Sequence, residues 1–283
     1  MVAELDTLPE NASLTKQVCD PRAFSGLLVM DGKYVKTRGF RKGAPFIWGI
    51  DYLTHDIPAG ILARIEDEDE FVRFFRTLAS LGYYPTVIVG DDRKGLKRAI
   101  TRVFPQARYQ LCHVHFLENI RQYLKVRTDP AHQHFFNSLK LHVFTEPKTI
   151  EQVVAGLRYV RDNRVQGDSL RQAVILGVHD RLPDLFTYLN VPGCPNNTNL
   201  IELYNSHLSA RLKSLKGFKS FLAAKGFLNA YLIRRRTKPL TDCDTAFKHL
   251  NGYASLQFTI KKQAPWPDIL GVKPPEKTLK TER

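Results

Sequence analysis

The segment GLLVMDGK at residues 26–33 predicts a short, buried β-strand over Gly26–Asp31 that ends on an acidic side chain. Gly32-Lys33 follows with the composition of a turn. Two further apolar runs, at 46–50 and 59–63, lie close behind it. Strands at such close spacing predict an antiparallel three-stranded meander.

Helices and strands alternate after this meander, and the chain then becomes helical. The next predicted elements are a helix over 71–81, a strand over 85–90, a helix over 94–103 and a strand over 107–111. The strand at 85–90 again ends on acids, Asp91 and Asp92. The order β-β-β-α-β-α-β predicts an α/β fold, and helical periodicity continues from residue 112 to about 189.

Composition shifts along the chain give its organisation. The parts are an irregular N-terminal segment (1–24), the first part of an α/β core (25–111), a helical insertion with a Cys-x-x-His motif (112–195), the second part of the core (196–240) and a basic, proline-rich tail (241–283).

Charge is the unusual global property of the chain. Its 283 residues are 43% hydrophobic and carry a formal net charge of +14. Residues 1–92 are net −4, whereas residues 93–283 are net +18. This asymmetry favours a polyanionic partner such as nucleic acid, although surface charge also serves solubility.

The same composition excludes several classes of protein. No apolar run approaches the roughly 20 residues that a membrane span needs, so we expect no membrane association. No secretory signal is visible, and four scattered cysteines do not make a disulfide scaffold. We therefore expect a cytoplasmic protein.

The acids at the strand ends are candidate metal ligands. Asp31 and Asp91 would meet if their strands neighbour each other in one sheet, and carboxylate oxygens suit Mg²⁺. Each acid has a simpler alternative as a turn residue, and Asp91 or Asp92 could cap the helix that follows.

A third acid opens an amphipathic helix that begins near residue 200. Its predicted inward-facing residues are Ile201, Tyr204, Leu208, Leu212 and Leu215. Its predicted polar face consists of Glu202, Asn205, Ser206, Ser209, Lys213 and Lys216. A face that begins with a carboxylate and becomes cationic suits a metal-bound phosphate. Alternatively, Asn199 and Glu202 form a capping box and the face is merely solvated.

Three motifs together resemble the catalytic part of Mutator-type transposases of bacterial insertion sequences. They are LVMDG at 28–32 with Lys33; DDRKGL at 91–96, followed by Phe104-Pro105, Gln110, CHVH at 112–115 and Asn119; and TNLIELYN at 198–205, followed by Arg211 and the segment 216–218. The family pattern places its second aspartate four residues before a glycine, which selects Asp91 over Asp92.

This resemblance implies a fold, a site and a reaction. The fold would be RNase H-like, a mixed five-stranded sheet with flanking helices that is interrupted by an all-helical insertion. Asp31, Asp91 and Glu202 would form a DDE triad that binds Mg²⁺, with Mn²⁺ as a substitute. The triad would cut DNA at transposon ends and join the freed 3′-OH to target DNA. We expect a homodimer or higher assembly on DNA in the bacterial cytoplasm, associated with the nucleoid.

One departure from the family pattern lies at the N-terminus. Members of the family carry a DNA-binding region there, whereas 24 residues precede the first predicted strand of this sequence. Either this chain is a truncated copy or recognition of the transposon ends lies elsewhere, and we expect weak, largely sequence-independent DNA binding.

Two further features bear on binding. Cys112, His113 and His115 have the residue types of a zinc site, but a structural site needs four ligands. We expect Cys112 to be a small buried residue, and His115 to be hydrogen-bonded near the acids or to contact DNA. The stretch 203–241 carries nine basic residues, no acid and interleaved aromatic residues. The predicted accessory or DNA-binding residues are Cys112, His115, Asn119, Asn205, Arg211, Lys213, Lys216, Lys219, Arg234, Arg235 and Arg236.

Two other functions remain open at this point. A decayed or repurposed transposase would bind DNA through the same basic surface without catalysis. An RNase H-type nuclease would share the metal chemistry, but the motif at 198–218 favours a transposase over it.

Overall fold

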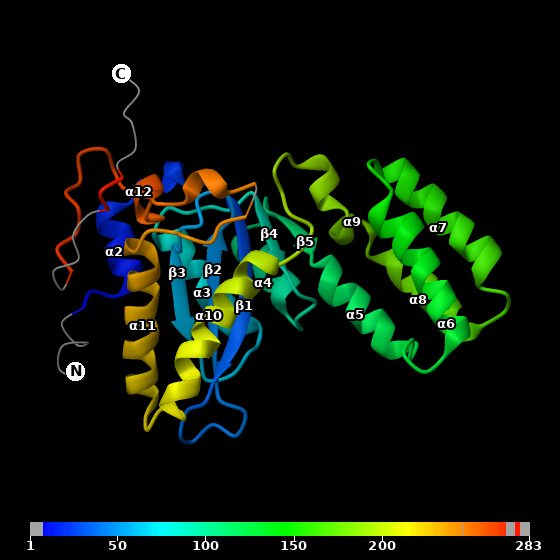
Figure 1. Ribbon diagram of the computed structural model, residues 1–283, viewed down its shortest axis with the longest axis horizontal. Coiled ribbons are helices and arrows are strands. Elements are labelled where there is room, and N and C mark those ends of the chain that lie inside the picture. The colour runs from blue at the N-terminus through cyan, green and yellow to red at the C-terminus, as the bar shows by residue number, and fades with distance from the viewer. Residues whose placement is uncertain (1–7, 245, 270–274, 278–283) are drawn as a thin grey trace. The chain divides into compact units, whose positions relative to one another are not determined.

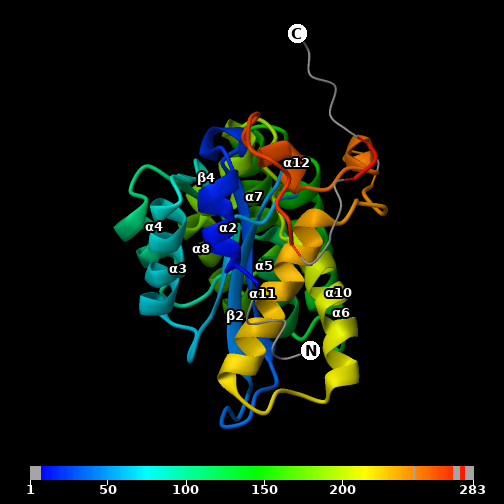
Figure 2. The ribbon, with the colours of Figure 1, turned by 90° about the vertical axis from the view of Figure 1, so that its left-hand side faces the viewer.

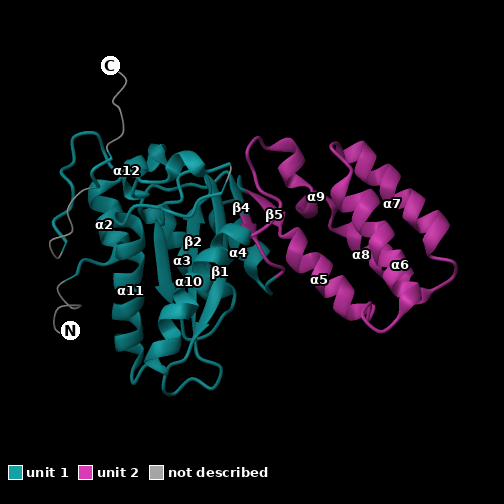
Figure 3. Cartoon of the chain, viewed as in Figure 1, with its two compact units in different colours: residues 1–88, 93–107, 199–283 teal, residues 89–92, 108–198 magenta. Residues whose placement is uncertain are grey.

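The computed structural model describes residues 8–244, 246–269 and 275–277. It divides into two compact units (Figure 3). Unit 1 consists of Met1–Ile88, Arg93–Ala107 and Asn199–Arg283, and unit 2 consists of Val89–Asp92 and Arg108–Thr198. None of the helices in the described ranges has both the length and the apolar character needed to cross a membrane.

The sheet has five strands in the order β3-β2-β1-β4-β5 (Figure 1). The strands are β1 (Leu27–Val35), β2 (Ala44–Asp51), β3 (Ala59–Leu62), β4 (Val87–Gly90) and β5 (Arg108–Leu111). Strands β1 and β2, and β2 and β3, pair antiparallel, so the predicted meander is confirmed. The predicted α/β class, a mixed five-stranded sheet with flanking helices, is also confirmed.

Strand β1 is longer than predicted, and the expected turn at Gly32-Lys33 is wrong. The ladder with β2 continues from Asp31, opposite Trp48, to Val35. The left-handed backbone that a turn requires occurs farther on, at Gly39 (φ +87°) and Gly43 (φ +88°). Asp31 therefore lies within a strand and not at its end.

Helices of unit 1 cover both faces of the sheet. They are α2 (Asn11–Val18), α3 (Glu68–Ser80), α4 (Leu96–Val103), α10 (Asn199–Leu215), α11 (Phe221–Thr237) and α12 (Leu256–Thr259), with 3-10 turns at Pro21–Ala23 and Lys248–Leu250. Figure 2 shows α3 and α4 on one side of the sheet and α10 and α11 on the other. Every residue of β2 is buried as a result.

The sequence predicted an irregular segment over 1–24, and this is wrong for its described part, which contains α2. This helix packs against β3 and α11. Leu14 of α2 is 2% exposed and lies in a core cluster with Ile233 and Ile269. Tertiary contacts more than 200 residues away along the chain therefore stabilise a helix whose own periodicity is weak.

Unit 2 is helical after β5, as predicted. Its elements are α5 (His113–Tyr123), α6 (Pro130–Leu139), a π-helix (Lys140–Thr145), α7 (Ile150–Arg164), α8 (Ser169–Asp180), α9 (Leu182–Leu185) and a 3-10 turn (Thr187–Asn190). Side chains of Asp129, Thr149 and Asp168 cap α6, α7 and α8. Rings of Phe144 and Phe186 meet His113 edge-on in the core of this unit.

Candidate active site

Asp31 is held in a fixed orientation by unit 1. One carboxylate oxygen, Oδ1, accepts a hydrogen bond from the backbone N–H of Gly32 at 2.7 Å. The other, Oδ2, accepts from the side-chain Nδ2 of Asn205 on α10, also at 2.7 Å. Asp31 is half-buried, so the carboxylate is both oriented and accessible from solvent.

Trp48 fixes the orientation of the Asn205 amide. Its indole N–H donates to Oδ1 of Asn205 at 3.2 Å. The amide oxygen therefore faces the indole, and the amide nitrogen faces Asp31. Both residues are buried, with Trp48 0% and Asn205 6% exposed. A buried chain of hydrogen bonds thus runs from β2 through α10 to β1.

The position of Asn205 differs from the one predicted for it. Helical spacing placed it on the polar face of α10, opposite the apolar face, but it is buried and hydrogen-bonded to residues of β1 and β2. The apolar face is also shorter than expected, because Leu212 is only half-buried and Leu215 is 38% exposed. The sequence carried no signal that Trp48 would hydrogen-bond to Asn205.

Glu202 lies in the first turn of α10, three residues before Asn205. Residues three apart share a helix face, and α10 packs on β1. Glu202 is half-buried. The helix that carries Glu202 is therefore the one that is hydrogen-bonded to Asp31.

Asp91 and Asp92 have different surroundings in unit 2. Asp91 directly follows β4 and is buried, and its backbone oxygen accepts from the hydroxyl of Tyr109 at 2.7 Å. Asp92 forms an exposed ion pair with Arg181 at 2.9 Å. The alternative interpretation, in which Asp91 or Asp92 caps α4, is wrong. The N-cap residue of that helix is Gly95, with φ +86° and no side-chain cap.

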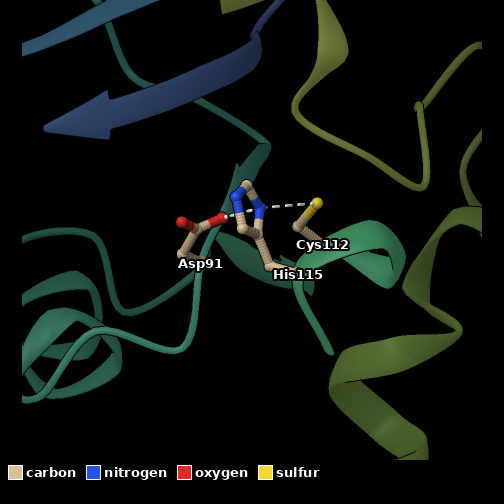
Figure 4. A group of neighbouring side chains, drawn as sticks. All are labelled: Asp91, Cys112 and His115. Carbon is tan, nitrogen blue, oxygen red and sulfur yellow. Dashed lines mark hydrogen bonds and ion pairs between the residues drawn. The ribbon is translucent and has the colours of Figure 1, made fainter. Parts of the chain in front are cut away.

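His115 lies against Asp91 and Cys112 (Figure 4). Its Nδ1 atom is 2.6 Å from Oδ1 of Asp91 and 3.3 Å from Sγ of Cys112. The hydrogen bond to Asp91, and then that to Cys112, raises the pKa of His115 to about 10. The imidazole is therefore positively charged at neutral pH and holds the Asp91 carboxylate. Asn119 is exposed one turn farther along α5.

The donors of Asp91, Cys112 and His115 lie within 4.8 Å of one another, the one such group in the described part of the chain. Three donors are fewer than a structural zinc site requires. The sulfur of Cys112 also accepts from the Thr198 hydroxyl at 3.2 Å. These contacts make the group a hydrogen-bonded cluster that orients Asp91.

The predicted DNA-binding cations divide by exposure. Arg211, Lys213, Lys216, Lys219 and Arg234 are exposed. Arg235 is half-buried, with its guanidinium 4.3 Å from the ring centroid of Tyr204. The exposed members, on α10, on α11 and in the segment between these helices, are available to an anionic ligand.

Arg236 is a correction to the sequence interpretation, because it cannot reach DNA. It is 0% exposed and forms two hydrogen bonds of 2.8 Å with the buried carboxylate of Asp56. Its Nη1 donates to Oδ1 of Asn11 and Oγ1 of Thr15, and its Nη2 also donates to Sγ of Cys19. The buried partners make Arg236 a structural residue that ties α11 to α2.

Comparison with known proteins matches this chain to transposases. A model of the family "Transposase, Mutator family" matches residues 24–234. The transposase for insertion sequence element IS256 in transposon Tn4001, from Staphylococcus aureus and from Enterococcus faecalis, is 29% identical over 174 residues. The transposase for insertion sequence element IS1201 of Lactobacillus helveticus is 26% identical over 134 residues.

The matched segments cover a larger share of this chain than of each relative. They represent 59% of this chain and 43% of the IS256 transposases, and 45% of this chain and 33% of the IS1201 transposase. The chain therefore matches less than half the length of each of these relatives.

Proposed function

Because the chain belongs to the Mutator family of transposases, we propose that it cuts DNA at transposon ends and joins the freed 3′ end to target DNA in a metal-dependent reaction. The observation that carries this proposal is the contact between Asn205 and Asp31. It connects the first acid to α10, the helix that bears the third acid, Glu202.

Asp31, Asp91 and Glu202 are the proposed metal ligands. Their carboxylate oxygens are the donors that Mg²⁺ prefers, and Mn²⁺ accepts the same ligands. The family uses divalent metal ions. A bound ion supplies Lewis acidity and stabilises charge on the phosphate oxygens.

The remaining residues of the site have positioning roles in this proposal. Asn205 orients Asp31, with its own orientation set by Trp48. His115 does the same for Asp91 from within unit 2. Exposed cations on α10 and α11, among them Arg211, Lys213 and Arg234, would neutralise DNA phosphates.

The partners in this proposal are the DNA of the transposon ends and the target DNA. Two ends must be brought together for transposition, so we propose that a homodimer or higher assembly acts on DNA. The place of action would be the bacterial cytoplasm, at the nucleoid.

The proposal is tested by nicking of supercoiled plasmid with Mg²⁺ or Mn²⁺. Asp31→Asn, Asp91→Asn and Glu202→Gln each remove a charge at nearly constant shape. Each is expected to lower the rate beyond the ~10–100-fold loss typical of outer-shell residues. Asp92→Asn is the matched control, because its exposed ion pair is worth about 1 kcal/mol or less.

The outcomes separate the candidate functions. Nicking by the wild type and by Asp92→Asn, but not by the three acid variants, supports the triad. Undiminished nicking by any acid variant removes that residue from the triad. DNA binding without metal-dependent nicking by the wild type would instead favour a non-catalytic DNA-binding protein.

A further inference from the structure

A strongly basic pocket lies on unit 1, between the β1–β2 loop and the segment that joins α10 to α11. Its volume is about 640 Å³, and it is lined by residues 36–43 and 216–219 together with Tyr34. The cations in its lining are Lys36, Arg38, Arg41, Lys42, Lys216 and Lys219. We call this site the hairpin pocket.

All of its cations are exposed, and none of its lining residues is acidic. None of the six forms an ion pair with a carboxylate in the described part of the chain. Six like charges around one depression repel one another, so their arrangement is favourable when an extended anion neutralises them.

The two loops are fixed to each other by the backbone. The N–H of Phe218 donates to the carbonyl of Lys36 at 2.8 Å, and the N–H of Arg38 donates to the carbonyl of Phe218 at 2.9 Å. Phe40 stacks on Phe221, the first residue of α11, with ring centroids 5.7 Å apart. The hairpin pocket is therefore a preformed surface whose cations need little backbone ordering to bind.

Gly217 permits this close approach of the loops. Its φ of +112° suits glycine, and a Cβ atom there would lie 3.1 Å from the backbone oxygen of Lys36. The preceding Lys216 is also left-handed, with φ +52°. Two consecutive unusual conformations turn the chain sharply after α10 and bring Lys216 and Lys219 beside the hairpin.

The position of the pocket relative to the acids of unit 1 follows from element geometry. Lys36 is five residues beyond Asp31, which is about 16 Å at the ~3.3 Å rise of a strand. Lys216 is fourteen residues beyond Glu202, which is about 21 Å at the ~1.5 Å rise of a helix. Such distances correspond to about five to six base pairs along a duplex, at about 3.4 Å per pair.

We propose that the hairpin pocket binds the phosphate backbone of duplex DNA about half a helical turn from the phosphate at Asp31 and Glu202. This inference rests on the proposed function for the location of the reacting phosphate. It adds a contact surface from the net-negative first third of the chain. Phosphate contacts carry no sequence information, so this pocket would set the register and path of DNA without reading it.

Lysine acetylation in the presence and absence of duplex DNA tests the pocket without mutation. We expect DNA to slow modification of Lys36, Lys42, Lys216 and Lys219 several-fold, measured by mass spectrometry. Lys248 and Lys262 are exposed lysines of unit 1 outside the pocket, and they are the internal controls. Equal rates at all six lysines with DNA bound would overturn the proposal.

Salt dependence gives a second measurement. The double variant Lys36→Gln/Lys42→Gln removes two phosphate contacts, so the slope of log Kobs against log salt concentration falls in magnitude by about 1.8. Between 50 and 200 mM salt, the wild type should then lose about 12-fold more affinity than the variant. Lys248→Gln/Lys262→Gln is the matched control and should keep the wild-type slope.

These results separate this inference from the proposed function. If the wild type nicks DNA through its triad but the pocket variant keeps the wild-type slope, only the hairpin pocket is refuted. If DNA protects the pocket lysines and no metal-dependent nicking occurs, the pocket stands and catalysis is refuted. Absence of DNA binding by the wild type would refute both.

Discussion

Substitution of Arg236 by methionine should destabilise the fold and leave DNA contacts intact. Methionine keeps much of the side-chain volume but removes every hydrogen bond of the guanidinium. The Asp56 carboxylate, now 0% exposed, would remain buried, and its remaining donors among the described residues would be the hydroxyls of Ser255 at 3.2 Å and Thr259 at 2.5 Å. Removal of one partner from a buried ion pair costs about 3–5 kcal/mol.

That loss is large against the total stability of a folded domain, about 5–15 kcal/mol. At a urea dependence of about 3 kcal/mol per molar, it lowers the unfolding midpoint by about 1 M or more. The core contacts of α2 depend on the same residue, through Asn11 and Thr15. Proteolysis of the N-terminal helix should therefore accelerate in the variant.

The assay is urea unfolding followed by circular dichroism, together with DNA binding below the transition. Arg234→Met is the matched control, because Arg234 is exposed on the same helix. It should change stability by less than about 0.5 kcal/mol. A double-mutant cycle with Asp56→Asn should give a coupling of about 0.5–3 kcal/mol. The reasoning is refuted if Arg236→Met keeps the wild-type midpoint and weakens DNA binding as Arg234→Met does.

Three further outcomes are expected. Trp48→Phe frees the amide of Asn205 to flip and should slow nicking by about 10-fold or more at unchanged DNA affinity. Burial lowers the pKa of His113 to about 4, whereas the unfolded chain protonates this histidine at about pH 6.5. The folded state therefore loses about 3 kcal/mol of stability as the pH falls from about 6.5 to 4. The variant His113→Phe should lack this loss, measured as a smaller decrease of the melting temperature over the same pH range. Gly217→Val should lower the melting temperature and weaken DNA binding, because a β-branched residue at φ +112° costs about 1–3 kcal/mol.

Local pattern was sufficient to predict the elements of the sheet and most helices. Alternation between short apolar runs and helical stripes placed β2, β3, α3 and the helical part of unit 2, because each is encoded within about ten consecutive residues. The turn predicted at Gly32-Lys33 failed for a nonlocal reason. Gly32 lies in a strand, where the absence of a Cβ leaves space for the carboxylate of Glu66.

The acidic residues of the candidate site could be predicted from the sequence, but the residues that orient them could not. Asp31, Asp91 and Glu202 stand in motifs that are visible in the sequence. Trp48 and Asn205 are hydrogen-bonded although they are 157 residues apart in the sequence. Asn205 is buried, whereas the helical pattern placed it on the polar face of α10. Arg236 likewise stands in a run of three arginines, and only tertiary burial separates it from the exposed Arg234.

The net charge of the first 92 residues gave no indication of the basic hairpin pocket. The first 92 residues are net −4, yet residues 32–50 contain five basic side chains and no acid. Some of the acids that produce the negative total are paired or buried in the fold. Glu68 pairs with Arg98 at 2.6 Å, and Asp56 is enclosed with Arg236.

Paired or buried acids contribute little field outside the protein, whereas exposed cations without such partners contribute most of it. Asp51, for example, is fully buried, and burial raises the pKa of its carboxyl above the usual value. The six cations of the hairpin pocket and the exposed cations of α10 and α11 therefore contribute to the potential that an approaching DNA molecule meets over unit 1. A segment with a negative sum can thus present a positive surface, and its role in DNA binding follows from which charges are left exposed.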